Sequence, residues 1–185
     1  MMRSNEPQQS IQLAQRIAGD VAEFSRPTAG GRIESIEQTP LDPAELLLAE
    51  YDRRVIDTDL RAATRSRFIS AHYADAIEAS VKALNECVRG RTGLALDGDG
   101  LMTTAFSVGN PLLRLNRLRS DSDKSEQRGH MMMCQGVVAA WRNPRAHSSQ
   151  FEDSPLNTIM MLEHVQHLMS VTKAATRSRR RRSTP

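Results

Sequence analysis

The sequence is poor in aromatic residues, in cysteine and in long apolar runs. Only 4% of the 185 residues are aromatic, whereas β-sandwiches and barrels depend on aromatic and β-branched residues in alternation. Alanine, leucine and methionine are instead frequent, and these residues favour helix. We therefore predict an all-α protein, an antiparallel helical bundle with short inserted helices.

The two cysteines, Cys87 and Cys134, both fall within apolar helical patterns. They predict neither a disulfide framework nor a metal cluster, and we expect no cofactor. No stretch approaches the length of an apolar transmembrane helix, and the first residues lack an apolar signal region. We therefore expect a cytoplasmic protein with no membrane partner.

Positive charge is concentrated near the end of the chain. The formal net charge is +3, but five of the 25 basic residues lie in the last nine positions: Arg177, Arg179, Arg180, Arg181 and Arg182. Without them, 20 basic residues face 22 acidic ones, a balance of −2. Attraction to nucleic acid would therefore come from these arginines or from a local patch such as Arg142 with Arg145.

Changes in composition divide the chain into three parts. Residues 1–40 are predicted to hold a short amphipathic helix and a linker rich in proline and glycine. Residues 41–174 are predicted to form the helical domain. Beyond them the apolar pattern disappears, so residues 175–185 are expected to form a disordered basic tail.

Capping signals predict where the helices of this domain begin. Asp42-Pro43 and Ser154-Pro155 each place a capping side chain before a proline at the first helical position. The sequence Asp-Gly-Asp-Gly at 97–100 does not continue as a calcium-binding loop, so we predict a turn there. Further helices are expected from about Asp57 to Arg89, over 101–107, after Asn110-Pro111, and from 121–125 onward.

The last of these helices leads to the stretch Ala-Trp-Arg-Asn-Pro-Arg-Ala-His at 140–147. Pro144 cannot donate a backbone hydrogen bond, so the helix is predicted to end near Arg142 or Asn143. Arg142 would then lie on the last rigid turn and His147 in the following loop, close enough to converge on one anion. Arg67 precedes His72 by the same gap, but no helix breaker follows it.

An arginine and a histidine held together suit the cleavage of RNA by its own 2′-hydroxyl. Histidine exchanges protons near neutral pH, and arginine binds phosphate oxygens through its planar fork. No metal is needed, and the expected products are a 2′,3′-cyclic phosphate and a 5′-hydroxyl. Because one histidine is awkward as both base and acid, we predict a two-fold homodimer that joins two copies of the loop in one cleft.

Structural roles compete with this interpretation. An arginine and a histidine at a helix C-terminus can simply satisfy carbonyl groups and the helix dipole. Arg145 is either a solvated loop residue or a second phosphate contact. His130 is expected to be exposed or half-buried, and no third metal ligand is evident beside His164 and His167, so these two are predicted to lie on a helix surface.

Residues from about 57 to 172 resemble the bacterial Ymh family, often grouped with abortive-infection proteins. The last matching block also resembles the Arg-polar-x3-His motif of the HEPN superfamily. The matching blocks are His72-Tyr73-Ala74-Asp75-Ala76 with Lys82-Ala83-Leu84, Gly100-Leu101-Met102 with Ala105-Phe106-Ser107, Asn110-Pro111-Leu112, and Gly136 with Arg142-Asn143-Pro144-Arg145-Ala146-His147.

The resemblance implies a HEPN-like helical bundle, a homodimer and a metal-independent endoribonuclease. Such an enzyme would act as a toxin or in phage defence, with RNA as substrate and an antitoxin or a defence-system protein as a further partner. Arg142 and His147 would be catalytic, and Asn143 would orient them.

One departure from the family pattern concerns the residues after the histidine. The family often has an acidic residue there, whereas this chain has Ser148 and Ser149. An orienting carboxylate would therefore be Glu152, Asp153 or a residue elsewhere in the chain.

Two other functions remain open. The first is a non-catalytic HEPN-like module that binds RNA or another protein and whose arginine tail touches nucleic acid. The second is a DNA-binding regulator, and the lack of a short helix-turn-helix unit with a basic recognition helix argues against it.

Overall fold

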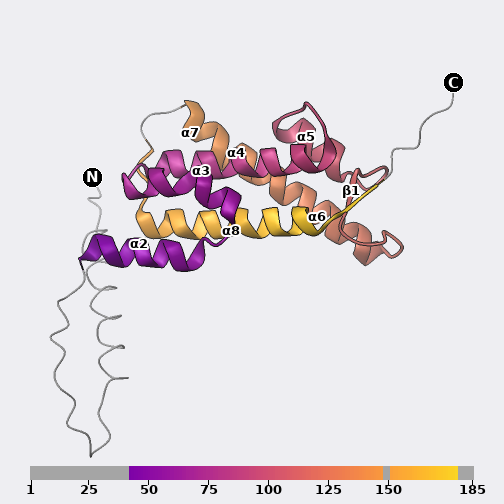
Figure 1. The fold of residues 1–185 in the computed structure, drawn as a ribbon. Helices are drawn as coiled ribbons and strands as arrows, with labels where there is room; N and C mark the ends of the chain where they lie inside the picture. Colours follow the sequence, from indigo (N-terminus) through magenta and orange to yellow (C-terminus); the bar gives the residue numbers. More distant parts are fainter. Residues whose placement is uncertain (1–41, 148–150, 179–185) are drawn as a thin grey trace, which may run out of the picture. The chain divides into compact units, whose positions relative to one another are not determined.

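The computed structural model describes residues 42–147 and 151–178, so the helix and linker predicted for residues 1–40 lie outside the described residues. The described chain is mainly α-helical with one very small sheet, and the all-α prediction is confirmed (Figure 1). None of its helices is long and apolar enough to span a bilayer. In chain order the elements are α2 (Pro43–Arg54), α3 (Thr58–Ile69), α4 (Tyr73–Thr92), α5 (Gly98–Phe106), β1 (Leu113–Arg114), α6 (Asp121–Val137), the π-helix η1 (Val138–Arg142), α7 (Asn143–His147), α8 (Pro155–Ala174) and β2 (Thr176–Arg177).

Side-chain caps fix the first residues of several helices as the sequence predicts. Asp42 accepts a hydrogen bond from the amide of Ala44 at 3.1 Å at the start of α2. Ser154 accepts one from the amide of Asn157 at 3.3 Å at the start of α8. Each bond satisfies one of the backbone donors that a helix leaves free at its N-terminus.

The single helix predicted from about residue 57 to 89 is wrong, because the chain forms α3 and α4 with a reversal between them. Ala71 adopts a φ of 56°, in the left-handed region, which stops a right-handed helix. The reversal lets α3 pack against α4, where the ring of Phe68 lies 5.3 Å from that of Tyr73, measured between centroids. Gly93 then ends α4 with a φ of 74°, as expected for a glycine after a helix.

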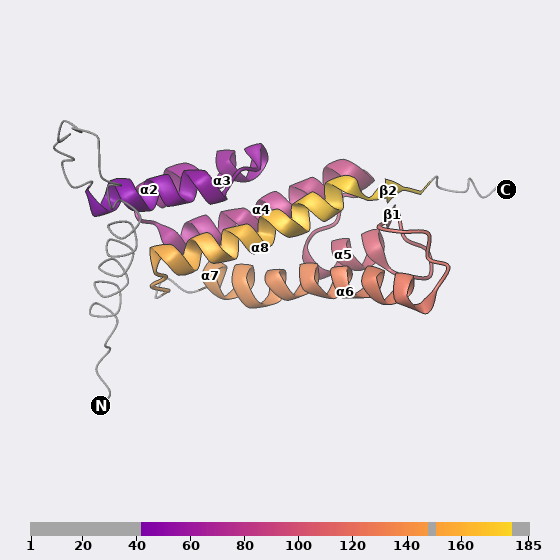
Figure 2. The ribbon, with the colours of Figure 1, turned by 90° about the horizontal axis from the view of Figure 1, so that it is seen from below.

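Helices α4 and α8 lie side by side and run in the same direction (Figures 1 and 2). Their C-terminal ends meet, since the guanidinium of Arg177 donates to the carbonyl oxygen of Thr92 at 3.2 Å. Helix α6 with η1 runs antiparallel to α8: His130 of α6 contacts Thr172, near the end of α8, while Trp141, further along in η1, contacts His164 in the middle of α8. The antiparallel arrangement therefore holds for α6 and α8 but not for α4 and α8.

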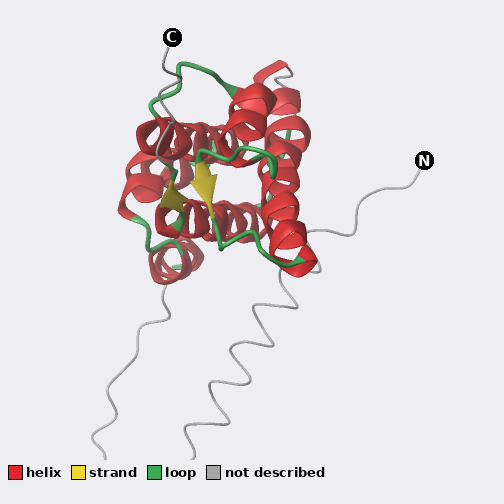
Figure 3. Cartoon of the chain, turned by 90° about the vertical axis from the view of Figure 1, so that its right-hand side faces the viewer, coloured by secondary structure: helices red, strands yellow, loops and turns green. Residues whose placement is uncertain are grey.

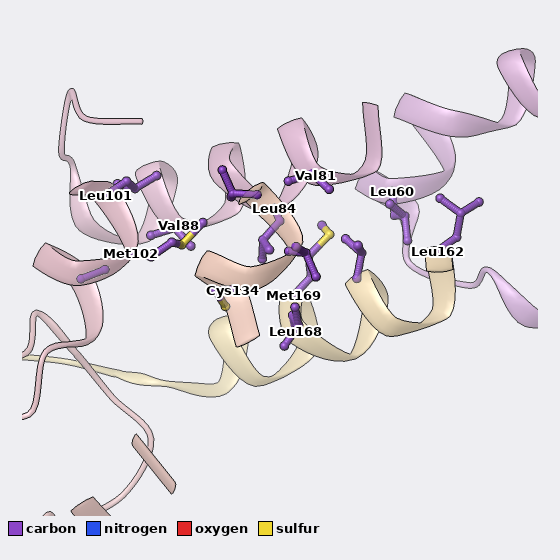
Figure 4. Packing of buried hydrophobic residues seen from close by; sticks show 14 of the residues in the cluster. Leu60, Val81, Leu84, Val88, Leu101, Met102, Cys134, Leu162, Leu168 and Met169 are labelled. Carbon is purple, nitrogen blue, oxygen red and sulfur yellow. The ribbon is translucent and has the colours of Figure 1, made fainter. Parts of the chain in front are cut away.

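The core lies where these helices meet (Figure 4). Leucine, valine and methionine side chains from α3, α4, α5, α6 and α8 fill it, and their burial supplies most of the favourable free energy of folding. Its fully buried members include Leu60, Val81, Leu84, Val88, Leu101, Met102, Cys134, Leu162, Leu168 and Met169.

The segment after Asn110-Pro111 is not helical, contrary to the prediction. The buried side chain of Gln127 donates to the carbonyl oxygens of Phe106 and Leu113, at 2.8 and 2.9 Å, and accepts from the amide of Leu115 at 3.0 Å. Backbone groups satisfied in this way do not need a helix. Leu113 is fully buried, and β1 pairs antiparallel with β2 at one end of the bundle (Figure 3).

The start of the predicted disordered tail at residue 175 is also wrong. Ala175 is buried, and Thr176 and Arg177 form β2 opposite Arg114 and Leu113. The amide of Ser178 adds a 2.8 Å hydrogen bond to the carbonyl of Leu112. The ordered domain therefore includes residues 175–178, and Arg177 is part of it.

Candidate functional site

The helix that carries Arg142 does not stop before Pro144. Helix α6 continues through η1 into α7, and the amide of Asn143 donates to the carbonyl of Val138, five residues earlier. The π-turn widens the backbone directly before Pro144, where the proline ring would otherwise clash with the carbonyl group four residues earlier. Pro144 has no backbone N–H, so no donor is left without a partner in the first turn of α7. The predicted loop between Arg142 and His147 is therefore wrong, since both residues are helical.

Arg142 faces the connection between α4 and α5. One of its guanidinium nitrogens donates to Asp97 at 3.3 Å and another to the side-chain oxygen of Asn143 at 3.4 Å. Its buried Nε has no partner in the described part of the chain. Charge-assisted bonds of this type are usually about 2.7–2.9 Å long, so the guanidinium is held in place but retains capacity for another acceptor.

Asp97 joins Arg142 to α4. The Asp97 carboxylate accepts from the Asn85 amide at 2.6 Å and from the Arg89 guanidinium at 3.1 Å. The only sequence signal at Asp97 is the rejected calcium-loop pattern, and Asn85 and Arg89 are not among the predicted site residues, although their spacing of four places them on one face of a helix. The carboxylate that contacts Arg142 thus comes from a different part of the chain than Glu152 or Asp153.

His147 is the last residue of α7 and is exposed. Five residues of α-helix turn through about 500°, which leaves His147 about 140° around the axis from Arg142. Arg142 is directed at Asp97, so one chain does not present the two side chains from one face. The expected convergence within a single loop is wrong.

Arg145 is neither a solvated residue nor a free phosphate contact. Its guanidinium forms a two-bond ion pair with Asp153 at 2.7 and 2.9 Å, and both side chains are only 7% exposed. It also donates to the carbonyl of Trp141 at 3.1 Å and stacks over the ring of Phe151 at 4.7 Å. Arg145 and Asp153 therefore hold α7 and the segment before α8 together, which leaves neither free for phosphate or for Arg142.

The candidate RNA contacts of the tail divide into two groups. The guanidinium of Arg177 donates to Thr92 at the end of α4, so this residue is tied to the folded domain. Arg179, Arg180, Arg181 and Arg182 lie outside the described residues.

His130 is buried, contrary to the prediction, at 2% exposure. Its ring packs edge-on against Phe106 at 4.8 Å, and its Nε2 lies 3.3 Å from the hydroxyl of Thr172. Removal from water lowers its pKa to about 4, and the electrostatic effect of His167 acts in the same direction. His130 is therefore neutral in the folded protein near neutral pH.

The remaining candidates lie on surfaces. His164 and His167 are exposed on α8, and the Trp141 ring packs against His164 at 5.4 Å. Over residues 42–147 and 151–178, no three histidine, cysteine or carboxylate side chains gather as a metal site would require. Cys87 and Cys134 are both free thiols.

Comparison with known proteins identifies the family. A family described as "Protein of unknown function (Hypoth_ymh)" matches residues 54–171, well over half of the chain. The chain belongs to this Ymh family. The match covers α3 to nearly the end of α8 and so includes Asn85, Arg89, Asp97 and Arg142. No curated protein and no solved structure matches the chain.

Proposed function

We propose that this Ymh-family protein is a metal-independent endoribonuclease of the HEPN type that acts as a toxin or phage-defence effector. The observation that carries the proposal is the way in which the Arg142 guanidinium is held. It is positioned by Asp97 and Asn143 through two long contacts, and its side chain is 28% exposed. A positioned guanidinium that is partly exposed and makes only long contacts can bind phosphate without a large rearrangement.

In the proposed reaction, His147 takes the proton from a ribose 2′-hydroxyl. The 2′-oxygen then forms a bond to phosphorus, and the bond from phosphorus to the 5′-oxygen breaks. Arg142 stabilises the negative charge on the phosphate oxygens, and Asn143 orients Arg142. The leaving 5′-oxygen takes a proton from the protonated His147 of a second copy, so the products are a 2′,3′-cyclic phosphate and a 5′-hydroxyl.

A second copy is needed because one His147 cannot serve as both the proton acceptor and the proton donor of this reaction. The exposed side of α6 and η1 suits such a partner, since it carries Met132, Gly136, Ala139 and Ala140. A Cβ added at Gly136 would meet no atom within 4 Å. Small residues permit close approach of another helix, and this line leads to Asn143 and the end of α7, so a two-fold dimer through it would bring two copies of His147 together.

Purified protein incubated with RNA in EDTA tests the chemistry. We expect cleavage that falls by at least about a hundredfold in His147→Ala and in Arg142→Ala. The matched controls are Arg67→Ala and His72→Ala, which have the same spacing elsewhere in the chain and should cleave as the wild type does. Equal cleavage by all five proteins would indicate a contaminating nuclease and contradict the proposal.

Molar mass measured by light scattering tests the proposed dimer separately. Gly136→Trp should give a monomer with little nuclease activity, because the indole would block the close approach, whereas Gly136→Ala should remain a dimer. A wild-type protein that is monomeric and fully active would refute the shared cleft.

The second candidate is a non-catalytic HEPN-like module that binds RNA or an antitoxin. The partial neutralisation of Arg142 by Asp97 and the separate direction of His147 favour it. Under this alternative the wild type binds RNA but leaves it intact, and its expression in bacteria inhibits growth no more than that of His147→Ala.

A further inference from the structure

Asp97 precedes a helix but does not make the capping hydrogen bond that similar residues make elsewhere in this protein. Asp42, Asp57, Ser120 and Ser154 each accept a hydrogen bond from the first turn of the helix that they precede. Asp97 precedes α5 with φ −135° and ψ 163°, a backbone conformation suited to capping, but its side chain makes no capping bond. Aspartate is among the best capping residues, so its carboxylate is used for something else.

That carboxylate lies among donors of the kind that bind phosphate. One oxygen accepts from Asn85 and Arg89, and the other accepts from Arg142. Asn85 is only 1% exposed, its side-chain nitrogen donates to this carboxylate, and within the described chain the buried Nε of Arg142 is unpartnered. Two guanidinium groups and a buried amide around one small anion are typical of phosphate recognition.

The geometry points to a phosphate-binding subsite formed by Arg89, Arg142 and Asn85, which Asp97 occupies in the free protein and vacates when a phosphate of the RNA backbone binds. Both guanidinium groups are reachable from solvent, at 29% and 28% exposure for Arg89 and Arg142. The displaced carboxylate has a second position available, because it can turn to cap α5. This inference rests on the proposed function for the identity of the ligand and adds Arg89 as a binding residue from α4.

Asp97 therefore acts as an internal competitor of RNA. Removing its charge should strengthen RNA binding, and removing Arg89 should weaken it. Opposite changes from two residues in direct contact are not expected if their ion pair is merely structural, because loss of either partner would then have the same effect.

Fluorescence anisotropy with a 2′-O-methyl oligouridine in EDTA measures this directly, since the probe lacks the attacking hydroxyl. We expect Arg89→Gln to weaken binding about tenfold, the effect of one charge-assisted bond, and to reduce the slope of log affinity against log salt by about 0.7. Asp97→Asn and Asp97→Ser should each strengthen binding by about the same factor. Asp97→Ser keeps a capping hydroxyl for α5, so at least one of the two variants is expected to fold.

Arg53→Gln is the matched control. Arg53 pairs with the carboxylate three residues before it, as Arg89 pairs with Glu86, but it lies on α2. Its affinity for the probe should equal that of the wild type. Circular dichroism on each variant separates altered binding from unfolding.

The outcomes separate this subsite from the proposed ribonuclease. Cleavage that needs Arg142 and His147, with an unchanged probe affinity in the Arg89 and Asp97 variants, overturns the subsite alone. Opposite shifts in affinity without any RNA cleavage support the subsite and contradict the ribonuclease. A probe that binds to none of the proteins overturns both.

Discussion

Arg142 and Arg145 lie three residues apart in one helical segment, and their surroundings differ sharply. Arg145 and Asp153 are buried together, with two short hydrogen bonds and a stacked ring. Arg142 and Asp97 are partly exposed and joined by one contact of 3.3 Å. A buried ion pair is costly to break from one side, whereas an exposed pair contributes little to stability. The comparison assigns Arg145 to the fold and leaves Arg142 available for a ligand.

The largest effect on stability is expected from Arg145→Gln. This change leaves the carboxylate of Asp153 buried without its cation, which typically costs about 3–5 kcal/mol. Urea unfolding followed by circular dichroism measures the loss. A loss under about 1 kcal/mol would mean that this pair resembles an exposed one.

The second prediction concerns His130, a buried polar residue whose effect on the free energy of unfolding should depend on pH. Its pKa is about 4 in the folded protein and 6.5 in a model peptide, so the unfolded chain binds more protons between these values. The contribution of His130 is therefore fully present above about pH 6.5 and is lost as the pH falls toward 4, by about 3 kcal/mol in total. The free energy of unfolding, plotted against pH over this range, should have a different slope in the wild type than in His130→Gln. Parallel curves would contradict the lowered pKa of His130.

A smaller effect is expected when both members of the buried pair become apolar. Arg145→Met combined with Asp153→Leu leaves no unpaired charge, so most of the loss seen with Arg145→Gln should be recovered. Its stability is expected within about 2 kcal/mol of the wild type, compared by the same urea titration. A double variant as unstable as the single one would show that the stacking and backbone contacts of Arg145 matter more than its charge.

The smallest effect on stability is expected from Arg142→Gln, at most about 1 kcal/mol. The same variant should lose RNA cleavage, whereas Arg145→Gln should retain it at temperatures where the protein is folded. If Arg142→Gln proved as destabilising as Arg145→Gln, the distinction between the two arginines would fail.

The sequence predicts those features that depend on neighbouring residues. The starts of α2 and α8 follow from Asp42-Pro43 and Ser154-Pro155, because capping and proline act within one turn. Ala71 carries no such signal, since alanine favours helix and its left-handed conformation is imposed by the packing of α3 on α4. The segment after Asn110 depends likewise on Gln127, a residue distant in the chain.

At the candidate site, too, contacts between residues distant in the chain could not be predicted. Arg142, Asn143 and His147 could be selected from one short stretch, but the partner of Arg142 comes from residue 97 and that of Arg145 from residue 153. Ion pairs of this kind are set by tertiary packing and have no local signature. The helix end predicted at Pro144 is also wrong, because a π-turn lets the helix continue past a proline that would otherwise end it.

The turn at η1 closes over five residues where an ordinary α-turn closes over four. Deleting Ala139 or Ala140 would let an ordinary α-turn span the same part of the helix, so Arg142, Asn143 and His147 would keep their present directions. The wider turn thus accommodates one additional residue without redirecting the polar side chains at this end of the helix.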